Sequence, residues 1–135
     1  MIGLDTNVLV RYLAQDDAKQ AAIATRMIEQ ELSAARPGFV SLVVLVETCW
    51  VLQRLYQASP DEVLATVQDL LDSAQFVLEQ RAVVQAAVQR MRSLPSAKVG
   101  FADVLVVESG TAQGCSQTVT FDKGAARSAG MVLLA

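Results

Sequence analysis

The chain has 135 residues, of which 53% are hydrophobic and 5% aromatic, and its formal net charge is −3. This length and apolar content predict one folded domain with an aliphatic core, and they exclude a disordered chain. The sequence contains no histidine, which excludes Ser-His-Asp and Cys-His catalysis and histidine-ligated zinc. Any hydrolytic chemistry must therefore use carboxylates, hydroxyls, lysine or a metal ion.

Short apolar strands alternate with helical patterns along the first half of the chain. We expect a strand over residues 2–5, a helix through Leu13, a longer helix capped by Asp16-Asp17 and ended by Pro37-Gly38, a strand at 39–40, and a helix from Ser41 to about Tyr56. The next helix begins at Ser59, where Pro60 and Glu62 complete a capping box.

The second half continues the same alternation. We expect a strand at 76–78 and helices over 81–94 and 101–113, the second of which ends at Gly114. A strand at 117–121, a short helix around 125–126 and a strand at 131–134 follow. This pattern indicates an α/β sandwich with a mainly parallel sheet, formed as a single domain over residues 1–135.

The charge and the cysteines give weaker constraints. An acidic chain is not a generic DNA-coating protein, because nucleic-acid affinity usually needs a basic footprint.

Cys49 and Cys115 form no CxxC pair and are predicted to be small core residues. The sequence shows no secretory leader pattern and no apolar run near the ~18 residues that span a bilayer, so we expect a cytoplasmic protein without membrane contact.

Four carboxylates lie at the edges of apolar strands and helices: Asp5, Glu47, Asp103 and Asp122. A buried carboxylate is costly unless it is paired, hydrogen-bonded or bound to a metal. Four acids in such settings favour a site for a hard cation, Mg²⁺ or Mn²⁺, and metal-assisted phosphodiester hydrolysis. Each acid alone also has a structural interpretation, as a helix cap, a turn residue or one half of a surface ion pair.

The order of the elements allows these acids to meet. Ligands of parallel α/β folds collect beyond the carboxyl ends of the strands. Asp5 and Asp122 occupy strand ends, and Glu47 and Asp103 fall in the first two turns of helices that start at the same edge. We therefore expect all four at one cleft.

The same residues carry a family resemblance. In order, Leu4-Asp5-Thr6-Asn7-Val8-Leu9, Glu47 in an apolar helix, Phe101-Ala102-Asp103-Val104-Leu105 and Thr120-Phe121-Asp122-Lys123 resemble a PIN domain, and more narrowly a VapC-type toxin ribonuclease. The likeness extends over essentially the whole chain. It implies a three-layer PIN-like sandwich and an Mg²⁺- or Mn²⁺-dependent endoribonuclease of a type II toxin–antitoxin module. It also implies a homodimer held inactive by a cognate antitoxin.

Carried over by residue, the resemblance assigns catalysis and metal binding to Asp5, Glu47, Asp103 and Asp122. Thr6 and Asn7 match the opening motif of the family, and Thr120 matches the hydroxyl residue before its last acid. Candidate contacts to RNA phosphates are the bases Arg11, Lys98 and Lys123, with Arg54 and Arg127 as further candidates. One departure is the run Gly124-Ala125-Ala126, where many relatives have another acid and then a large apolar residue.

Two other functions remain open at this point. A phosphotransfer domain also gathers acids at strand ends, although the dehalogenase-type motif needs a second aspartate where this chain has Asn7. A non-catalytic PIN-like binding module would keep the fold without the chemistry. The presence of all four acids argues against that module.

Overall fold

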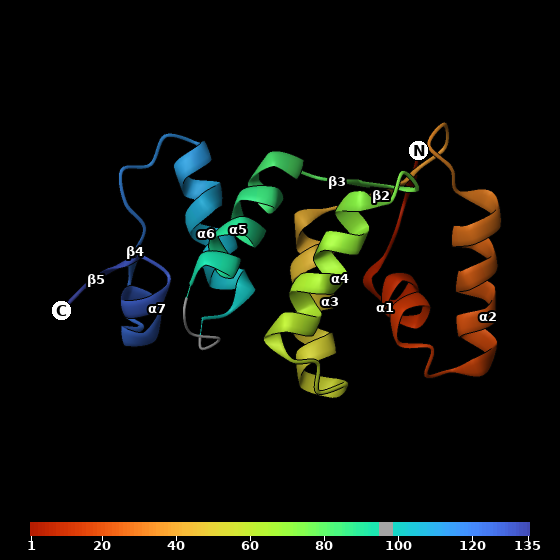
Figure 1. The fold of residues 1–135 in the computed structure, drawn as a ribbon, viewed down its shortest axis with the longest axis horizontal. Helices are drawn as coiled ribbons and strands as arrows, with labels where there is room; N and C mark the ends of the chain where they lie inside the picture. The colour runs from red at the N-terminus through yellow and green to blue at the C-terminus, as the bar shows by residue number, and fades with distance from the viewer. Residues whose placement is uncertain (95–98) are drawn as a thin grey trace. The chain divides into compact units, whose positions relative to one another are not determined.

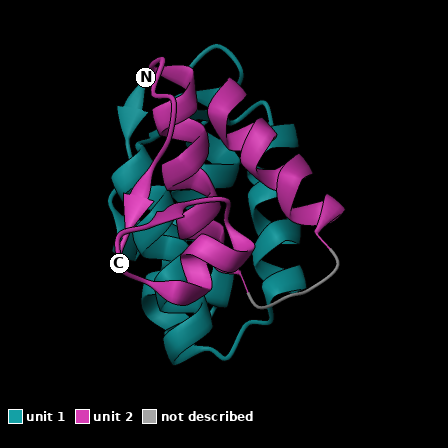
Figure 2. Cartoon of the chain, turned by 90° about the vertical axis from the view of Figure 1, so that its left-hand side faces the viewer, with its two compact units in different colours: residues 1–81 teal, residues 82–135 magenta. Residues whose placement is uncertain are grey.

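The computed structural model describes residues 1–94 and 99–135. Figure 1 shows the elements along the chain. The chain divides into two compact units, unit 1, Met1–Arg81, and unit 2, Ala82–Ala135, which Figure 2 colours separately. Within the described residues, no helix is long and apolar enough to cross a membrane.

Unit 1 is built around a parallel sheet. Its elements are β1 (Ile2–Gly3), α1 (Thr6–Ala14), α2 (Ala18–Arg26), η1 (Met27–Glu31), β2 (Gly38–Val40), α3 (Leu42–Leu55), α4 (Pro60–Asp72) and β3 (Phe76–Leu78). The strand order is β1-β2-β3, with both pairings parallel. Helix α1 packs against α2 and α3, and α4 packs against α3 and β3 (Figure 1).

Gly38 allows the middle strand to pack closely. It pairs with Ile2 on one side and with Phe76 on the other. A Cβ at this position would lie 2.8 Å from the Cδ1 atoms of both Leu32 and Leu4, which are buried. A side chain at residue 38 would therefore displace the leucines that cover the sheet.

Side-chain caps start the helices of unit 1 where the sequence predicts them. Ser41 Oγ accepts from the backbone N–H of Val44 at 3.1 Å and starts α3. Ser59 and Glu62 form the predicted capping box, in which Ser59 Oγ accepts from Glu62 N at 3.1 Å and Glu62 Oε1 from Ser59 N at 2.9 Å. These contacts satisfy amide groups that the first helical turn leaves unpaired.

The helix that begins after Asp17 ends differently from the prediction. It changes to a π-helical turn at Met27 and stops at Glu31, so the predicted extension to Pro37-Gly38 is wrong. The Gln75 side chain donates from Nε2 to the Ile28 carbonyl at 2.9 Å. Leu32, the residue after Glu31, has an extended backbone and is 3% exposed. The helix therefore ends where the Leu32 side chain is buried.

Unit 2 holds the rest of the chain. It comprises α5 (Arg81–Ser93, whose first residue belongs to unit 1), α6 (Phe101–Ala112), β4 (Val119–Thr120), α7 (Lys123–Ser128) and β5 (Val132–Leu133). Strands β4 and β5 pair in parallel. After α6, Gly114 takes a φ of 92°, a left-handed conformation that glycine adopts at little cost.

Arg90 joins three elements of unit 2. Its Nη1 atom lies 3.5 Å from Glu108 Oε1 on α6, and its Nη2 atom donates to the Ala129 carbonyl after α7.

Helices and parallel strands in both units confirm the predicted α/β class with mainly parallel strands.

Candidate functional site

Asp5 stands at the junction of β1 and α1. It is the N-cap of α1, and its Oδ1 atom accepts from the backbone N–H of Thr6 at 2.8 Å. The side chain is exposed, and Oδ2 has no hydrogen-bond partner among the described residues. One carboxylate oxygen is therefore anchored by a backbone amide, and the described residues leave the other without a partner.

Glu47 is held beside this junction by Thr6. The Thr6 hydroxyl, which is 8% exposed, donates a hydrogen bond to Glu47 Oε1. Glu47 lies in the second turn of α3, and its side chain is exposed. Because Thr6 directly follows Asp5, the contact brings the two predicted acids of unit 1 to the same end of its sheet.

Asp122 repeats the arrangement of Asp5 in unit 2. It is the N-cap of α7, where Oδ1 accepts from Gly124 N at 2.7 Å and from Ala125 N at 3.3 Å. The Thr120 hydroxyl accepts from the backbone N–H of Asp122 at 3.0 Å. Thr120 thus orients the backbone of Asp122 rather than its carboxylate.

Gly124 contributes to this cap. A Cβ on residue 124 would lie 3.2 Å from Asp122 Oδ1, closer than most real Cβ contacts. The glycine that departs from the usual family pattern therefore leaves room for the carboxylate to reach two amide groups.

Asp103 lies in the first turn of α6 and is half-buried. An acid in this turn is stabilised by the positive end of the helix dipole. The N-cap of α6, Gly100, provides no side-chain hydrogen bond. Asp103 is therefore the one predicted acid whose carboxylate makes no hydrogen bond among the described residues.

The four predicted acids fall two in each unit. Within either unit by itself, the described aspartates, glutamates and cysteines form no group of three that could hold a metal ion. The donor set nevertheless suits a hard cation, because carboxylate oxygens are the ligands that Mg²⁺ and Mn²⁺ prefer. In Asp5, Glu47 and Asp122, one oxygen is fixed by a hydrogen bond and the second is unengaged by the described residues.

The base predicted at Arg11 is already paired. Its Nη1 atom lies 3.3 Å from Asp16 Oδ1, and its Nε atom donates to Gln20 Oε1 at 2.8 Å. Tyr56 donates from its hydroxyl to Asp16, and this hydrogen bond lowers the pKa of the Asp16 carboxyl below its usual value. Arg11 thus belongs to a polar network that links α1, α2 and the end of α3.

The other predicted substrate contacts differ in position. Lys123 is exposed at the start of α7, next to Asp122, and pairs with no carboxylate among the described residues. Lys98 lies outside the described residues. Asn7, from the predicted opening motif, is exposed on the first turn of α1.

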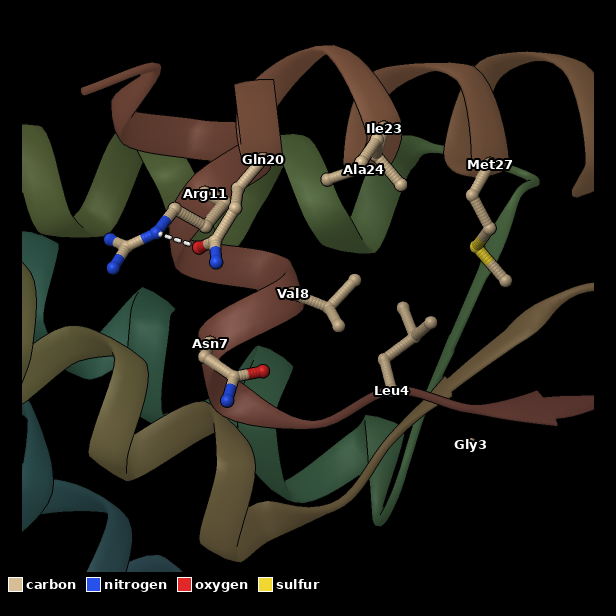
Figure 3. A pocket seen from close by; sticks show the side chains of 9 residues that line it. All are labelled: Gly3, Leu4, Asn7, Val8, Arg11, Gln20, Ile23, Ala24 and Met27. Carbon is tan, nitrogen blue, oxygen red and sulfur yellow. Dashed lines mark hydrogen bonds between the residues drawn. The ribbon is translucent and has the colours of Figure 1, made fainter. Parts of the chain in front are cut away.

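Asn7 and Arg11 line a pocket of about 390 Å³ between the β1–α1 segment and α2. The other lining residues are mainly apolar: Gly3, Leu4, Val8, Gln20, Ile23, Ala24 and Met27. Figure 3 shows the polar side chains of Asn7, Arg11 and Gln20 on one side of this pocket and Met27 on the opposite side. Ile23 lines the pocket and is 55% exposed.

Glu79 makes a contact that the sequence did not predict, and Cys115 is more exposed than predicted. Glu79 lies just after β3 and is exposed, and its Oε1 atom accepts from Leu42 N at 2.8 Å at the start of α3. Its position after an apolar strand, like that of Asp5, was the available signal. Cys115 is exposed, so its predicted core role is wrong, whereas Cys49 is buried. Burial raises the pKa of Cys49 from 9.0 to about 12.

Comparisons with known proteins add one positive finding. The family model described as PIN domain matches residues 2–131 of this chain. A comparison with curated proteins gives no match. The matched range includes all four predicted acids and every described element except β5, which follows it.

Proposed function

Because the chain belongs to the PIN domain family, we propose that it is a metal-dependent endoribonuclease that hydrolyses phosphodiester bonds of single-stranded RNA. Members of this family are generally nucleases and generally use divalent metal ions. The match spans both units, which supports treating residues 1–135 as one PIN-like domain. Neither a phosphotransfer domain nor a non-catalytic binding module is favoured by this match.

The hydrogen bond from Thr6 to Glu47 is the observation that carries the proposal. Glu47 comes from the middle of an apolar sequence, yet its side chain is exposed. The Thr6 hydroxyl holds one of its oxygens next to the cap of Asp5, and the other oxygen has no hydrogen-bond partner among the described residues. Two carboxylates held at one strand end, each with an oxygen that the described residues leave unengaged, suit a divalent cation.

We assign ligation of Mg²⁺ or Mn²⁺ to Asp5 and Asp103 directly, and to Glu47 and Asp122 directly or through water. The bound ion would activate a water molecule for attack on the phosphorus and neutralise charge as the bond to the leaving ribose oxygen breaks. The caps at Asp5 and Asp122 fix one oxygen of each carboxylate, which reduces the reorganisation that metal binding requires.

The remaining predicted residues have supporting roles in this proposal. Thr6 positions Glu47, and Thr120 positions the backbone of Asp122. Lys123, an exposed cation next to Asp122, contacts a phosphate of the RNA. Arg11 is a second phosphate contact that must first leave its ion pair with Asp16. Lys98 remains a candidate from the sequence alone.

The biological role follows from the narrower resemblance. The chain is the toxin component of a type II toxin–antitoxin module, works in the cytoplasm as a homodimer and is inhibited by a cognate antitoxin. The opening motif Asp5-Thr6-Asn7 and the ordered quartet of acids support this assignment.

Cleavage of a mixed cellular RNA pool by the purified protein tests the enzymatic proposal. Reactions contain Mn²⁺, Mg²⁺ or EDTA, and they compare the wild type with Asp5→Asn, Glu47→Gln, Asp103→Asn and Asp122→Asn. Asp69→Asn is the matched control, because Asp69 is an exposed acid on α4 with no proposed role. We expect metal-dependent cutting that survives in the control and is lost in the four site variants.

Absence of cutting by folded wild-type protein with either metal would reject the nuclease. Equal activity in Asp103→Asn and the wild type would reject the assigned site. Growth arrest on expression of the wild type, but not of Asp103→Asn, would support the toxin role, and sedimentation velocity would test the homodimer.

A further inference from the structure

An exposed stripe on α3 combines an aromatic ring with a cation beside Glu47. Val43, Glu47, Trp50 and Arg54 are all exposed and, at 100° per residue, fall within about 60° of one another around the helix. The exposed fractions are 76% for Val43 and 53% for Trp50. A tryptophan of such exposure on a helix is unusual, because large rings gain by burial.

Arg54 stacks on this tryptophan. Its Cζ atom lies 4.8 Å from the centroid of the Trp50 ring. The ion pairs within the described residues are Arg11–Asp16 and Arg90–Glu108, so Arg54 has no carboxylate partner there. Arg54 therefore covers one face of a half-exposed indole ring, and its guanidinium has no carboxylate partner among the described residues.

We infer that Trp50 and Arg54 form a platform that binds a nucleotide of single-stranded RNA next to the cleavage site, with a base stacked on Trp50 and a phosphate paired with Arg54. The inference rests on the proposed function, because Glu47 marks the reacting end of the platform. Trp50 follows Glu47 by three residues, about 4.5 Å along the helix axis. Aromatic rings with nearby cations bind single-stranded nucleic acid in this way.

A protein partner, including a second copy of the chain, is the competing occupant. Trp and Arg also concentrate at protein interfaces. A partner seated on the stripe would cover Glu47, whose second oxygen has no hydrogen-bond partner among the described residues. An RNA strand needs that oxygen open to a metal ion and the cation of Arg54 open to a phosphate, so the stripe suits RNA better.

Trp50 is the only tryptophan in the sequence, so its fluorescence reports this site alone. Titrations of the full chain in EDTA use a short single-stranded RNA, the same sequence as a duplex, and inorganic polyphosphate. We expect saturable quenching with single-stranded RNA and little with the duplex or polyphosphate. RNA binding without quenching would overturn the inference, as would equal quenching by polyphosphate.

Variants then separate stacking from charge, with affinity measured by the anisotropy of a labelled RNA. Trp50→Leu should weaken binding roughly ten- to a hundredfold, and Trp50→Phe should restore most of the affinity. Arg54→Gln should lower the slope of log affinity against log salt by about 0.7. Leu55→Ala and Arg26→Gln are matched controls, since both residues are exposed but lie outside the stripe. Unchanged affinity in Trp50→Leu would reject the platform.

Cleavage assays distinguish this inference from the proposed function. If Trp50→Leu raises KM while kcat stays near the wild-type value, the platform and the nuclease both stand. Metal-dependent cutting with the same KM in Trp50→Leu rejects the platform and leaves the nuclease intact. Loss of self-association in Trp50→Leu with unchanged RNA affinity would show that the stripe binds a second copy, which also rejects the platform.

Discussion

The Thr6 hydroxyl donates to Glu47 Oε1 across 41 positions of the chain. Thr6 belongs to the first turn of α1, and Glu47 to the second turn of α3. The contact ties the start of one helix to the face of another at the carboxyl end of β1. It gives the Glu47 carboxylate a fixed orientation without burying it, which is what a ligand carboxylate requires.

Loss of this hydrogen bond should be measurable without any assay of activity. We predict that Thr6→Val lowers the free energy of unfolding by about 1 kcal/mol, because it removes a bond to a charged but solvated acceptor. Thr6→Ser keeps the hydroxyl and should lose less. Urea unfolding followed by circular dichroism measures both. An unchanged free energy of unfolding in Thr6→Val would mean that the hydroxyl of Thr6 does not stabilise the fold.

The neighbour of Glu47 presents the opposite situation. Thr48 is 1% exposed, and its hydroxyl has no hydrogen-bond partner among the described residues. We predict that Thr48→Val raises the free energy of unfolding by about 1 kcal/mol, because it replaces an unsatisfied buried hydroxyl with a methyl group of similar size. Chemical denaturation of Thr48→Val and of Thr48→Ala, which leaves a cavity, provides the measurement. A less stable valine variant would contradict the unpaired state of the hydroxyl.

The capping box of α4 should make stability depend on pH. Hydrogen bonds from the Ser59 backbone and hydroxyl groups lower the pKa of Glu62 from its usual value of 4.5. Because the folded pKa is the lower one, Glu62 stabilises the protein fully above 4.5, and this contribution disappears as the pH falls through the folded pKa. Glu62→Gln should thus be less stable than the wild type at pH 7, with the difference shrinking in acid. A difference that is constant from pH 7 to the acid limit would disprove the linkage.

The cap itself has a simpler test. Ser59→Ala removes the hydroxyl that accepts from Glu62 N, and we expect a loss of about 1 kcal/mol in the free energy of unfolding. Ser59→Asp should retain most of the stability, because aspartate is also a favourable N-cap. Thermal unfolding of the three proteins distinguishes them. A melting temperature of the alanine variant equal to that of the wild type would show that the cap contributes nothing at this helix end.

The two cysteines should react at very different rates. Cys115 is exposed, whereas Cys49 is buried with a pKa raised to about 12, so little of it is thiolate near neutral pH. We predict one maleimide label per folded chain, two per unfolded chain, and none on folded Cys115→Ser. Mass spectrometry counts the labels. Rapid modification of Cys49 in the folded Cys115→Ser variant would show that α3 opens easily.

The sequence predicted best what is determined by neighbouring residues. The caps at Ser41, at Ser59 with Glu62, and at Asp5 follow from side chains that reach amides two or three residues away or closer. The α/β class follows from the alternation of apolar runs. For the same reason, each predicted acid was found at a strand end or in an early helical turn.

Contacts between distant residues were not predictable in this way. Nothing in the local pattern indicates that Glu79 accepts from Leu42 or that Gln75 binds the Ile28 carbonyl. The same holds for Cys115, whose apolar character predicted burial in a segment that is exposed. The hydrogen bond between Thr6 and Glu47 is also such a distant contact, although the sequence predicted both as site residues. Metal ligation by the four acids remains a prediction.

The π-helical turn η1, which follows α2, is hydrogen-bonded to the segment just before a strand far along the chain. A π turn contains one residue more than an α turn and usually reflects a single inserted residue. Here the Ile28 carbonyl is taken up by Gln75, the residue immediately before β3. The end of this helix is therefore held by a glutamine that lies 47 positions later.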